Sequence, residues 1–85
     1  MVSSVVRTDS FERAVRKLKD AAVRERIKNQ VAELVERPDI GQPLRHPLKS
    51  ERAVWVPPFR IIYAVAGDTL YLLDFRKRDE AYRRS

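Results

Sequence analysis

Arginines in the second half of the chain are the residues most suited to do chemistry. Arg60 lies inside an apolar run at 59–65, and Arg78 follows a second apolar run that ends at Phe75. A guanidinium offers a planar fork of donors that matches the oxygens of a phosphate. Tyr82 comes four residues after Arg78, so both can lie on one face of a helical turn. This set can hold a phosphodiester and stabilise charge that develops on it. A solvated basic tail with a packed tyrosine is an equally good interpretation.

The composition excludes several other kinds of chemistry. The 85 residues include no cysteine, which excludes a disulfide scaffold and a thiolate nucleophile. The only histidine, His46, cannot by itself form a histidine-based metal site, and the chain has no glycine-rich phosphate loop. We therefore expect neither a metal nor a cofactor.

The charge and length suggest a small domain with a charged partner. Lysine and arginine number 18 against 12 acidic residues, which gives a formal net charge of +6. This excess favours a polyanionic partner, and an acidic protein is also compatible with it. A chain of this size forms one domain, residues 1–85, with a modest core. No apolar run has the length of a signal peptide or a membrane span, so we expect a cytoplasmic protein without membrane contact.

The spacing of apolar residues predicts an α+β domain in the order strand, helix, helix, strand, strand, strand. Two helices, capped by Asp9 and Asp20, are expected to pack on one face of a small, mostly antiparallel sheet. A single long helix is the alternative. The expected segments are a strand at 2–7, helices up to Pro38, a basic loop at 39–50, strands at 52–56, 59–65 and 69–75, and a short C-terminal turn or helix.

Two turns connect the last three strands. Gly67 and Asp68 predict a two-residue type II′ hairpin, because glycine takes a positive φ without steric cost. The pair Pro57-Pro58 predicts a type VI turn with a cis peptide bond. The hairpin sets the register of the two strands. The expected pairs are Ala66 with Thr69, Ala64 with Tyr71, Ile62 with Leu73, and Arg60 with Phe75.

This register gives the sheet two different faces. The face assigned to the helices contains Phe59, Ile61, Tyr63, Val65, Leu70 and Leu72. The second face carries Arg60 among largely apolar residues, which are Ile62, Ala64, Tyr71, Leu73 and Phe75. A small sheet with helices on one side only should not leave such a face in water. We therefore expect a second protein chain to cover it.

Three motifs together suggest a family. They are the segment Gly41-Gln42-Pro43-Leu44, the strand Phe59-Arg60-Ile61-Ile62-Tyr63, and the ending Lys77-Arg78-Asp79-Glu80-Ala81-Tyr82. The last two are the more specific. With these motifs in this order, the chain resembles the RelE/ParE superfamily of toxins from type II toxin–antitoxin systems over nearly its whole length. The resemblance implies a single RelE-like toxin domain.

The RelE branch of this superfamily acts on the ribosome. Resemblance to it implies that the toxin enters the ribosomal A site and cuts messenger RNA there, with the neighbouring 2′-hydroxyl attacking the phosphate. Such a toxin is a metal-independent endoribonuclease that inhibits translation. The implied partners are the ribosome, its messenger RNA and an acidic RelB-like antitoxin that neutralises the toxin.

The same resemblance gives roles to individual residues. Arg60 resembles the arginine that holds the scissile phosphate, Arg78 the arginine that stabilises the transition state or leaving group, and Tyr82 the tyrosine that orients or stacks on the messenger. The cations expected to bind RNA or the ribosome are Arg45, Lys49, Arg52, Arg76, Lys77, Arg83 and Arg84. The antitoxin is expected to bind Ile62, Ala64, Tyr71, Leu73 and Phe75.

The general base of the cleavage step is not assigned. Some RelE members carry paired lysines on the strand before the arginine strand, where Lys49 and Arg52 are the nearest cations of this chain. An arginine stays protonated and is a poor base, and Glu51 is only a possible one. Two alternatives therefore stay open. One is a ParE-like inhibitor of DNA gyrase, although such members usually lack the terminal arginine–tyrosine set, and the other is a degenerate toxin that only binds its antitoxin.

Overall fold

The computed structural model describes residues 2–44 and 51–77, which form a five-stranded sheet with two helices. The elements are β1 (Ser4–Arg7), α1 (Asp9–Arg16), α2 (Ala21–Glu36), β2 (Gln42–Pro43), β3 (Glu51–Val56), β4 (Phe59–Ala66) and β5 (Thr69–Lys77). The strand order is β1-β5-β4-β3-β2. Strand β1 runs parallel to β5, and the other neighbours are antiparallel. The predicted α+β class is confirmed.

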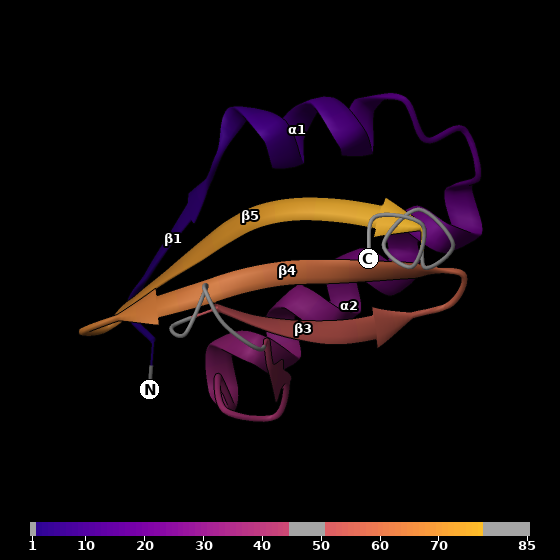
Figure 1. Cartoon of the computed structure of the whole chain (residues 1–85). Coiled ribbons are helices and arrows are strands. Elements are labelled where there is room, and N and C mark those ends of the chain that lie inside the picture. Colours follow the sequence, from indigo (N-terminus) through magenta and orange to yellow (C-terminus); the bar gives the residue numbers. More distant parts are fainter. Residues whose placement is uncertain (1, 45–50, 78–85) are drawn as a thin grey trace.

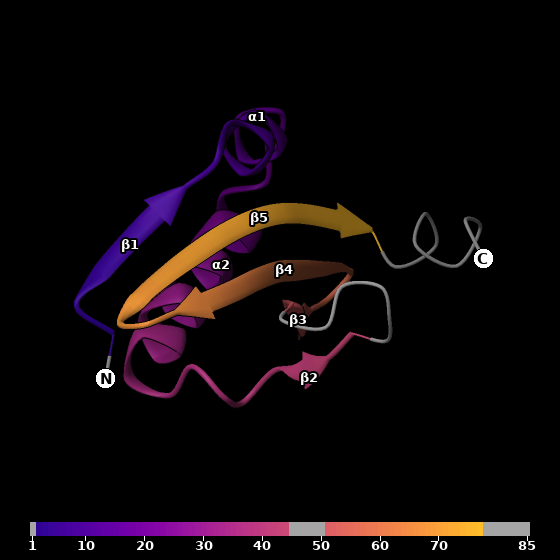
Figure 2. The ribbon, with the colours of Figure 1, turned by 60° about the vertical axis from the view of Figure 1, so that its left-hand side comes forward.

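The two helices lie along the sheet rather than at its ends. Helix α1 lies beside β5, and α2 passes behind β4 and β3 (Figure 1), an arrangement that is also visible in the turned view (Figure 2). Both helices contribute to one core with the strands. Its buried members are Val2, Phe11, Val23, Ile27, Leu34, Val56, Ile61, Tyr63, Leu70, Leu72 and Phe75. Neither described helix is long and apolar enough to cross a membrane.

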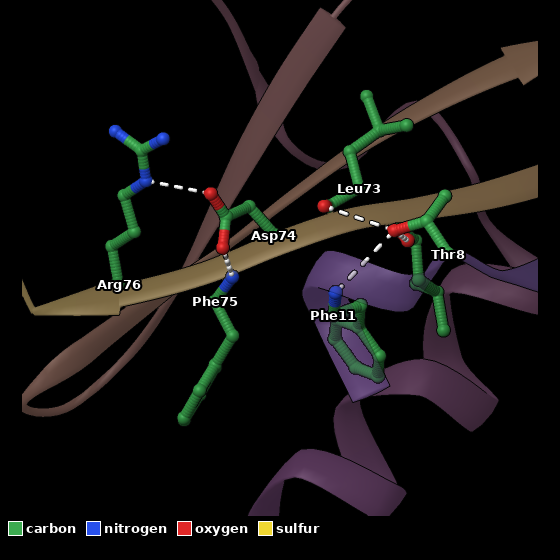
Figure 3. A network of polar contacts seen from close by, with 7 residues as sticks. Thr8, Phe11, Leu73, Asp74, Phe75 and Arg76 are labelled. Carbon is green, nitrogen blue, oxygen red and sulfur yellow. Dashed lines mark hydrogen bonds and ion pairs between the residues drawn. The ribbon is translucent and has the colours of Figure 1, made fainter. Parts of the chain in front are cut away.

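The first helix is capped by a threonine that also holds it against the sheet. The Thr8 hydroxyl accepts a hydrogen bond from the Phe11 amide at 3.4 Å and donates to the Leu72 carbonyl at 2.8 Å, with the Leu73 carbonyl at 3.1 Å (Figure 3). The prediction that Asp9 caps this helix is therefore wrong by one residue. Thr8 wins because its hydroxyl serves the helix start and β5 at once.

The predicted break between two helices is confirmed. The Asp20 carboxylate accepts hydrogen bonds from the amides of Ala22 and Val23 at 2.9 and 3.3 Å, which satisfies the free donors at the start of α2. The Arg24 guanidinium donates twice to the Leu18 carbonyl, at 2.9 and 2.6 Å. Hydrogen bonds of Asp20 and Arg24 thus hold the short connection between α1 and α2 in place.

Both predicted turns are present. Gly67 has φ +62° and begins the hairpin between β4 and β5, and Ala66 pairs with Thr69 as expected. The peptide bond between Pro57 and Pro58 is cis. The region predicted as loop differs in one respect, because Gln42–Pro43 forms the short edge strand β2 against β3.

The predicted register of β4 and β5 holds near the hairpin and fails beyond it. A bulge between Ile62 and Tyr63 shifts the pairing by one residue, so that no residue of β4 is paired with Leu73. The observed pairs past the bulge are Ile62 with Asp74, Ile61 with Phe75, Arg60 with Arg76, and Phe59 with Lys77. The predicted pairs Ile62–Leu73 and Arg60–Phe75 are therefore wrong.

The bulge moves Phe75 from the predicted second face into the core. Its side chain is 6% exposed, packs edge-on against Phe11 with ring centroids 6.5 Å apart, and stacks on Phe59 at 4.4 Å. Figure 3 shows Phe75 and Leu73 on opposite sides of β5. Without the extra residue, strict alternation would bury the Asp74 carboxylate and expose this phenyl ring.

Candidate functional site

The face of the sheet opposite the helices carries a row of three functional candidates. Trp55 on β3 is paired with Arg60 on β4, which is paired with Arg76 on β5. Directly opposed residues of neighbouring strands point to the same side, so the three side chains share one face. The structure thus brings Arg60 and Arg76 together, as expected for cations that bind one ligand.

The two arginines differ in their surroundings. Arg76 forms an ion pair with Asp74, in which Nε lies 2.7 Å from Oδ2. Arg60 is partly buried, and its guanidinium has no hydrogen bond or ion pair to another residue within 2–44 and 51–77. Its donors are therefore available to a ligand as far as the described part of the chain is concerned.

A pocket of about 290 Å³ opens beside Arg60, between β2 and the end of β3. Its lining combines one guanidinium with an indole and small apolar surfaces, and includes Gln42, Pro43, Ala53, Trp55 and Arg60. Trp55 is 45% exposed. An aromatic surface next to a cation suits a nucleotide, because the base can stack while the phosphate pairs with the arginine.

A buried tyrosine holds the chain segment that lines this pocket. The Tyr63 hydroxyl accepts a hydrogen bond from the Gly41 amide at 2.9 Å and donates one to the Pro38 carbonyl at 2.7 Å. The absence of a side chain at Gly41 is required here, because an added Cβ would overlap the Tyr63 hydroxyl and lie 2.9 Å from the Ala53 carbonyl oxygen. The segment 38–44 is thereby pressed onto β3 and β4.

Arg52 fastens the same segment from β3. Its Nη1 donates to the Gly41 carbonyl at 2.7 Å and to the Asp39 carbonyl at 3.3 Å. The role of Arg52 in RNA binding stays a prediction, while its contacts give it a structural role that the sequence did not reveal. The Gly41-Gln42-Pro43-Leu44 motif was the available signal, because it marks a close approach of backbone to a side chain.

Burial also changes the acidity of the tyrosine. Loss of water around the ring raises the pKa of Tyr63 above its ordinary value near 10, whereas the hydrogen bond with Gly41 and the charge of Arg52 act in the opposite direction. Asp39 adds a smaller increase. The hydroxyl therefore stays protonated at physiological pH and keeps its donor role toward Pro38.

Several predicted cations are separated from Arg60 or lie beyond the described chain. Lys77 is paired with Phe59, so it faces the helix side, where it borders a hollow with Lys17 and Lys19. Six predicted residues lie outside the described residues, namely Arg45, Lys49, Arg78, Tyr82, Arg83 and Arg84. The possible base Glu51 is paired with Ala64 and is on the order of 13 Å along the strands from Arg60, at about 3.4 Å per residue.

The apolar part of the second face is smaller than predicted. Ile62, Ala64, Tyr71 and Leu73 are half-buried, and Phe75 is absent from this face because it belongs to the core. Asp74, for which the sequence predicted no role, lies on this face beside Arg76. No group of three or more potential metal ligands lies together in the described ranges.

Comparison with known proteins agrees with this architecture. A family model described as ParE toxin of type II toxin-antitoxin system, parDE, matches residues 5–82. The fold is similar to that of a YoeB/ParE toxin from Agrobacterium tumefaciens, with TM-score 0.80, 20% identity, and coverage of 89% of this chain and 99% of that chain. Comparison with curated protein sequences gave no match.

Two solved toxin–antitoxin complexes have the same fold. A mutant of the toxin RelE from E. coli, bound to a peptide of the antitoxin RelBc, gives TM-score 0.80 at 22% identity, covering 99% of this chain and 94% of that one. The RelBE2 complex from Mycobacterium tuberculosis gives TM-score 0.77 at 21% identity, covering 92% and 100%. The family model spans nearly the whole chain, so the protein belongs to the ParE toxin family of type II toxin–antitoxin systems, within the RelE/ParE superfamily.

Proposed function

We propose that this toxin cuts messenger RNA in the ribosomal A site and so inhibits translation. The observation that carries the proposal is the position of Arg60, opposite Arg76 on the sheet face away from the helices and beside the Trp55 pocket. Two arginines in direct opposition repel each other and destabilise the strand pair, and the Asp74 carboxylate offsets this repulsion only at Nε of Arg76. An anion between them removes this repulsion, so the site favours a phosphate.

The chemistry requires no metal. The 2′-hydroxyl next to the scissile phosphate attacks phosphorus, and the leaving group is the 5′-oxygen of the following nucleotide. The Arg60 guanidinium holds the phosphate and stabilises the charge on its oxygens, while the ribosome holds the messenger in position. Arg78 and Tyr82, which follow β5, take the transition-state and orienting roles that the resemblance to RelE implies.

The toxin is kept inactive by an acidic RelB-like antitoxin. The surface that suits it is the apolar part of the second face, formed by Ile62, Ala64, Tyr71 and Leu73. A chain that covers this face and reaches the arginines with carboxylates also blocks the phosphate site. The site of action on ribosomes corresponds to a cytoplasmic protein.

Cleavage on purified ribosomes tests the proposal. Arg60→Ala should lower the rate of codon-phased cleavage by about 10²–10³, the usual cost of removing one donor that stabilises a transition state. Arg13→Ala is the matched control, because it removes the same charge from an exposed position on α1. If the wild-type toxin produces no phased cleavage, or if both variants lose activity equally, the proposal is wrong.

A second candidate is inhibition of DNA gyrase. The description of the matching family, ParE of parDE, favours it. In that case the toxin binds a protein and cuts no RNA. Gyrase-dependent DNA breaks on expression, with intact messenger RNA, would support this function in place of the first.

A further inference from the structure

Asp74 occupies a position on the second face that only the bulge makes possible. The extra residue Leu73 turns the Asp74 side chain away from the core, to the side of β5 that carries Arg76 (Figure 3). One carboxylate oxygen, Oδ1, accepts the Phe75 amide at 2.7 Å, and the other, Oδ2, accepts Arg76 Nε at 2.7 Å. The carboxylate is therefore held from two sides.

The ion pair engages Arg76 at Nε, and the two terminal nitrogens have no hydrogen bond to another residue in the described ranges 2–44 and 51–77. Asp74 contacts only Nε, and Figure 3 shows both terminal nitrogens of Arg76 pointing away from the carboxylate. The Arg76 side chain is 46% exposed, against 24% for that of Asp74. An arginine held at Nε keeps two parallel donors, which is the arrangement that binds two oxygens of one phosphate.

We propose that Asp74 is a positioning residue that orients Arg76 toward Arg60, so that the two guanidiniums bind one RNA phosphodiester from adjacent strands. The observations are the bulge, the contact at Nε and the direct opposition of Arg60 and Arg76. The inference rests on the proposed function for its substrate. It extends that function by giving a role to Asp74. On charge alone, this carboxylate would be expected to repel RNA.

The two interpretations of Asp74 predict opposite effects of the substitution Asp74→Asn. If its charge alone matters, Asp74→Asn removes a negative charge near the phosphate and strengthens binding of RNA. If it orients Arg76, the same substitution releases the long arginine side chain into many rotamers and slows cleavage, because small misplacements of a catalytic group are costly. The asparagine keeps an oxygen that can accept the Phe75 amide, so β5 is preserved.

A double-mutant cycle on programmed ribosomes separates these accounts. We expect Asp74→Asn to lower kcat about tenfold with little change in KM, because on the ribosome the messenger is held in position mainly by the ribosome and not by Arg76. In an Arg76→Ala background it should have no further effect, because the residue it orients is gone. Asp9→Asn, which makes the same change of charge on the exposed start of α1, should leave kcat unchanged. Unchanged or faster cleavage by Asp74→Asn overturns the inference, as do effects of Asp74→Asn and Arg76→Ala that multiply in the double variant.

Nitrogen-15 NMR of the arginine side chains gives a readout that does not depend on cleavage. The Arg76 Nε–H signal should be protected from exchange with water in the wild type and lost in Asp74→Asn. Titration with a trinucleotide RNA should shift the Arg60 and Arg76 signals together, with severalfold weaker binding in Asp74→Asn. If these results hold while ribosomal cleavage is absent, the proposed function fails and the orienting role stands. An unprotected Arg76 signal overturns the role even if the toxin cleaves.

Discussion

The Tyr63 hydroxyl donates a 2.7 Å hydrogen bond to the Pro38 carbonyl, and so ties the central strand β4 to the chain that leaves α2. The same oxygen accepts the Gly41 amide. Through these two bonds a buried residue of the helix side fixes β2, which lines the pocket beside Arg60 on the other side. The position of β2 in the candidate site therefore depends on a residue of the core.

Removing this hydroxyl should destabilise the fold. In Tyr63→Phe the Gly41 amide and the Pro38 carbonyl lose their partner, which costs about 1–3 kcal/mol when the groups are shielded from water. Urea unfolding followed by circular dichroism measures this loss. Tyr71→Phe, on the half-buried second face, is the control and should change the free energy of unfolding little. Equal losses in the two variants would show that the hydroxyl of Tyr63 is not special.

The raised pKa of Tyr63 predicts a loss of stability at alkaline pH. Burial raises this pKa in the folded state, so the unfolded chain releases the phenolic proton first, near pH 10. The contribution is therefore complete below about pH 10 and is lost as the pH rises through the folded-state pKa. Between pH 9 and 11 the free energy of unfolding should fall more steeply for the wild type than for Tyr63→Phe. Parallel curves would contradict the assignment.

The two glycines of the chain should respond differently to alanine. In Gly41→Ala the new Cβ meets the Tyr63 ring and the Ala53 carbonyl, so the segment 38–44 must move, at a cost of about 1–3 kcal/mol. In Gly67→Ala no atom lies within 4 Å, and only the positive φ is strained, by about 1 kcal/mol. We expect both variants to lose stability, but only Gly41→Ala to weaken ribosomal cleavage. If Gly67→Ala impairs cleavage equally, the position of β2 does not matter.

The parts of the fold that could be predicted from the sequence are those with local signals. Gly67 marks the hairpin, Asp20 marks the start of α2, and Pro57-Pro58 marks the cis turn, and each acts within a few residues. The bulge at Leu73 has no such signal, because it is decided by the contact of Phe75 with Phe11 across the core. One indication of an irregularity was present in the sequence, because strict alternation would place the charged Asp74 on the helix side.

In the candidate site, too, only the features with a local sequence signal could be predicted. The motif around Arg60 is continuous in sequence, so the place of Arg60 on the second face followed from alternation. The pairing of Arg60 with Arg76 did not follow, since it depends on the bulge. The clasp between Tyr63 and Gly41 joins residues far apart in the chain, and no periodicity indicates such a contact.

Arg52 and Arg60 should separate structural from functional arginines. Arg52→Ala removes hydrogen bonds to the Gly41 and Asp39 carbonyls, and should cost about 1–2 kcal/mol of stability. Arg60→Ala removes a cation that faces Arg76, and should change stability by less than about 0.5 kcal/mol while lowering the cleavage rate by about 10²–10³. Thermal unfolding and the ribosome assay on both variants check this. A stable Arg52→Ala protein with lost RNA binding would instead assign Arg52 to the messenger.

The bulge itself can be tested with two substitutions on β5. Phe75 stacks on Phe59 and lies in the core, so Phe75→Ala should lower the free energy of unfolding by about 3–5 kcal/mol. Leu73 is half-buried on the second face, so Leu73→Ala should cost less than about 1.5 kcal/mol in the free toxin. The affinity for the antitoxin should show the opposite order. Leu73→Ala should weaken binding more than Phe75→Ala, because it removes surface proposed to bind the antitoxin. Urea unfolding of both variants, and their affinity for the antitoxin, measure the two effects. A larger stability loss for Leu73→Ala than for Phe75→Ala would restore the unbroken register and return Phe75 to the second face.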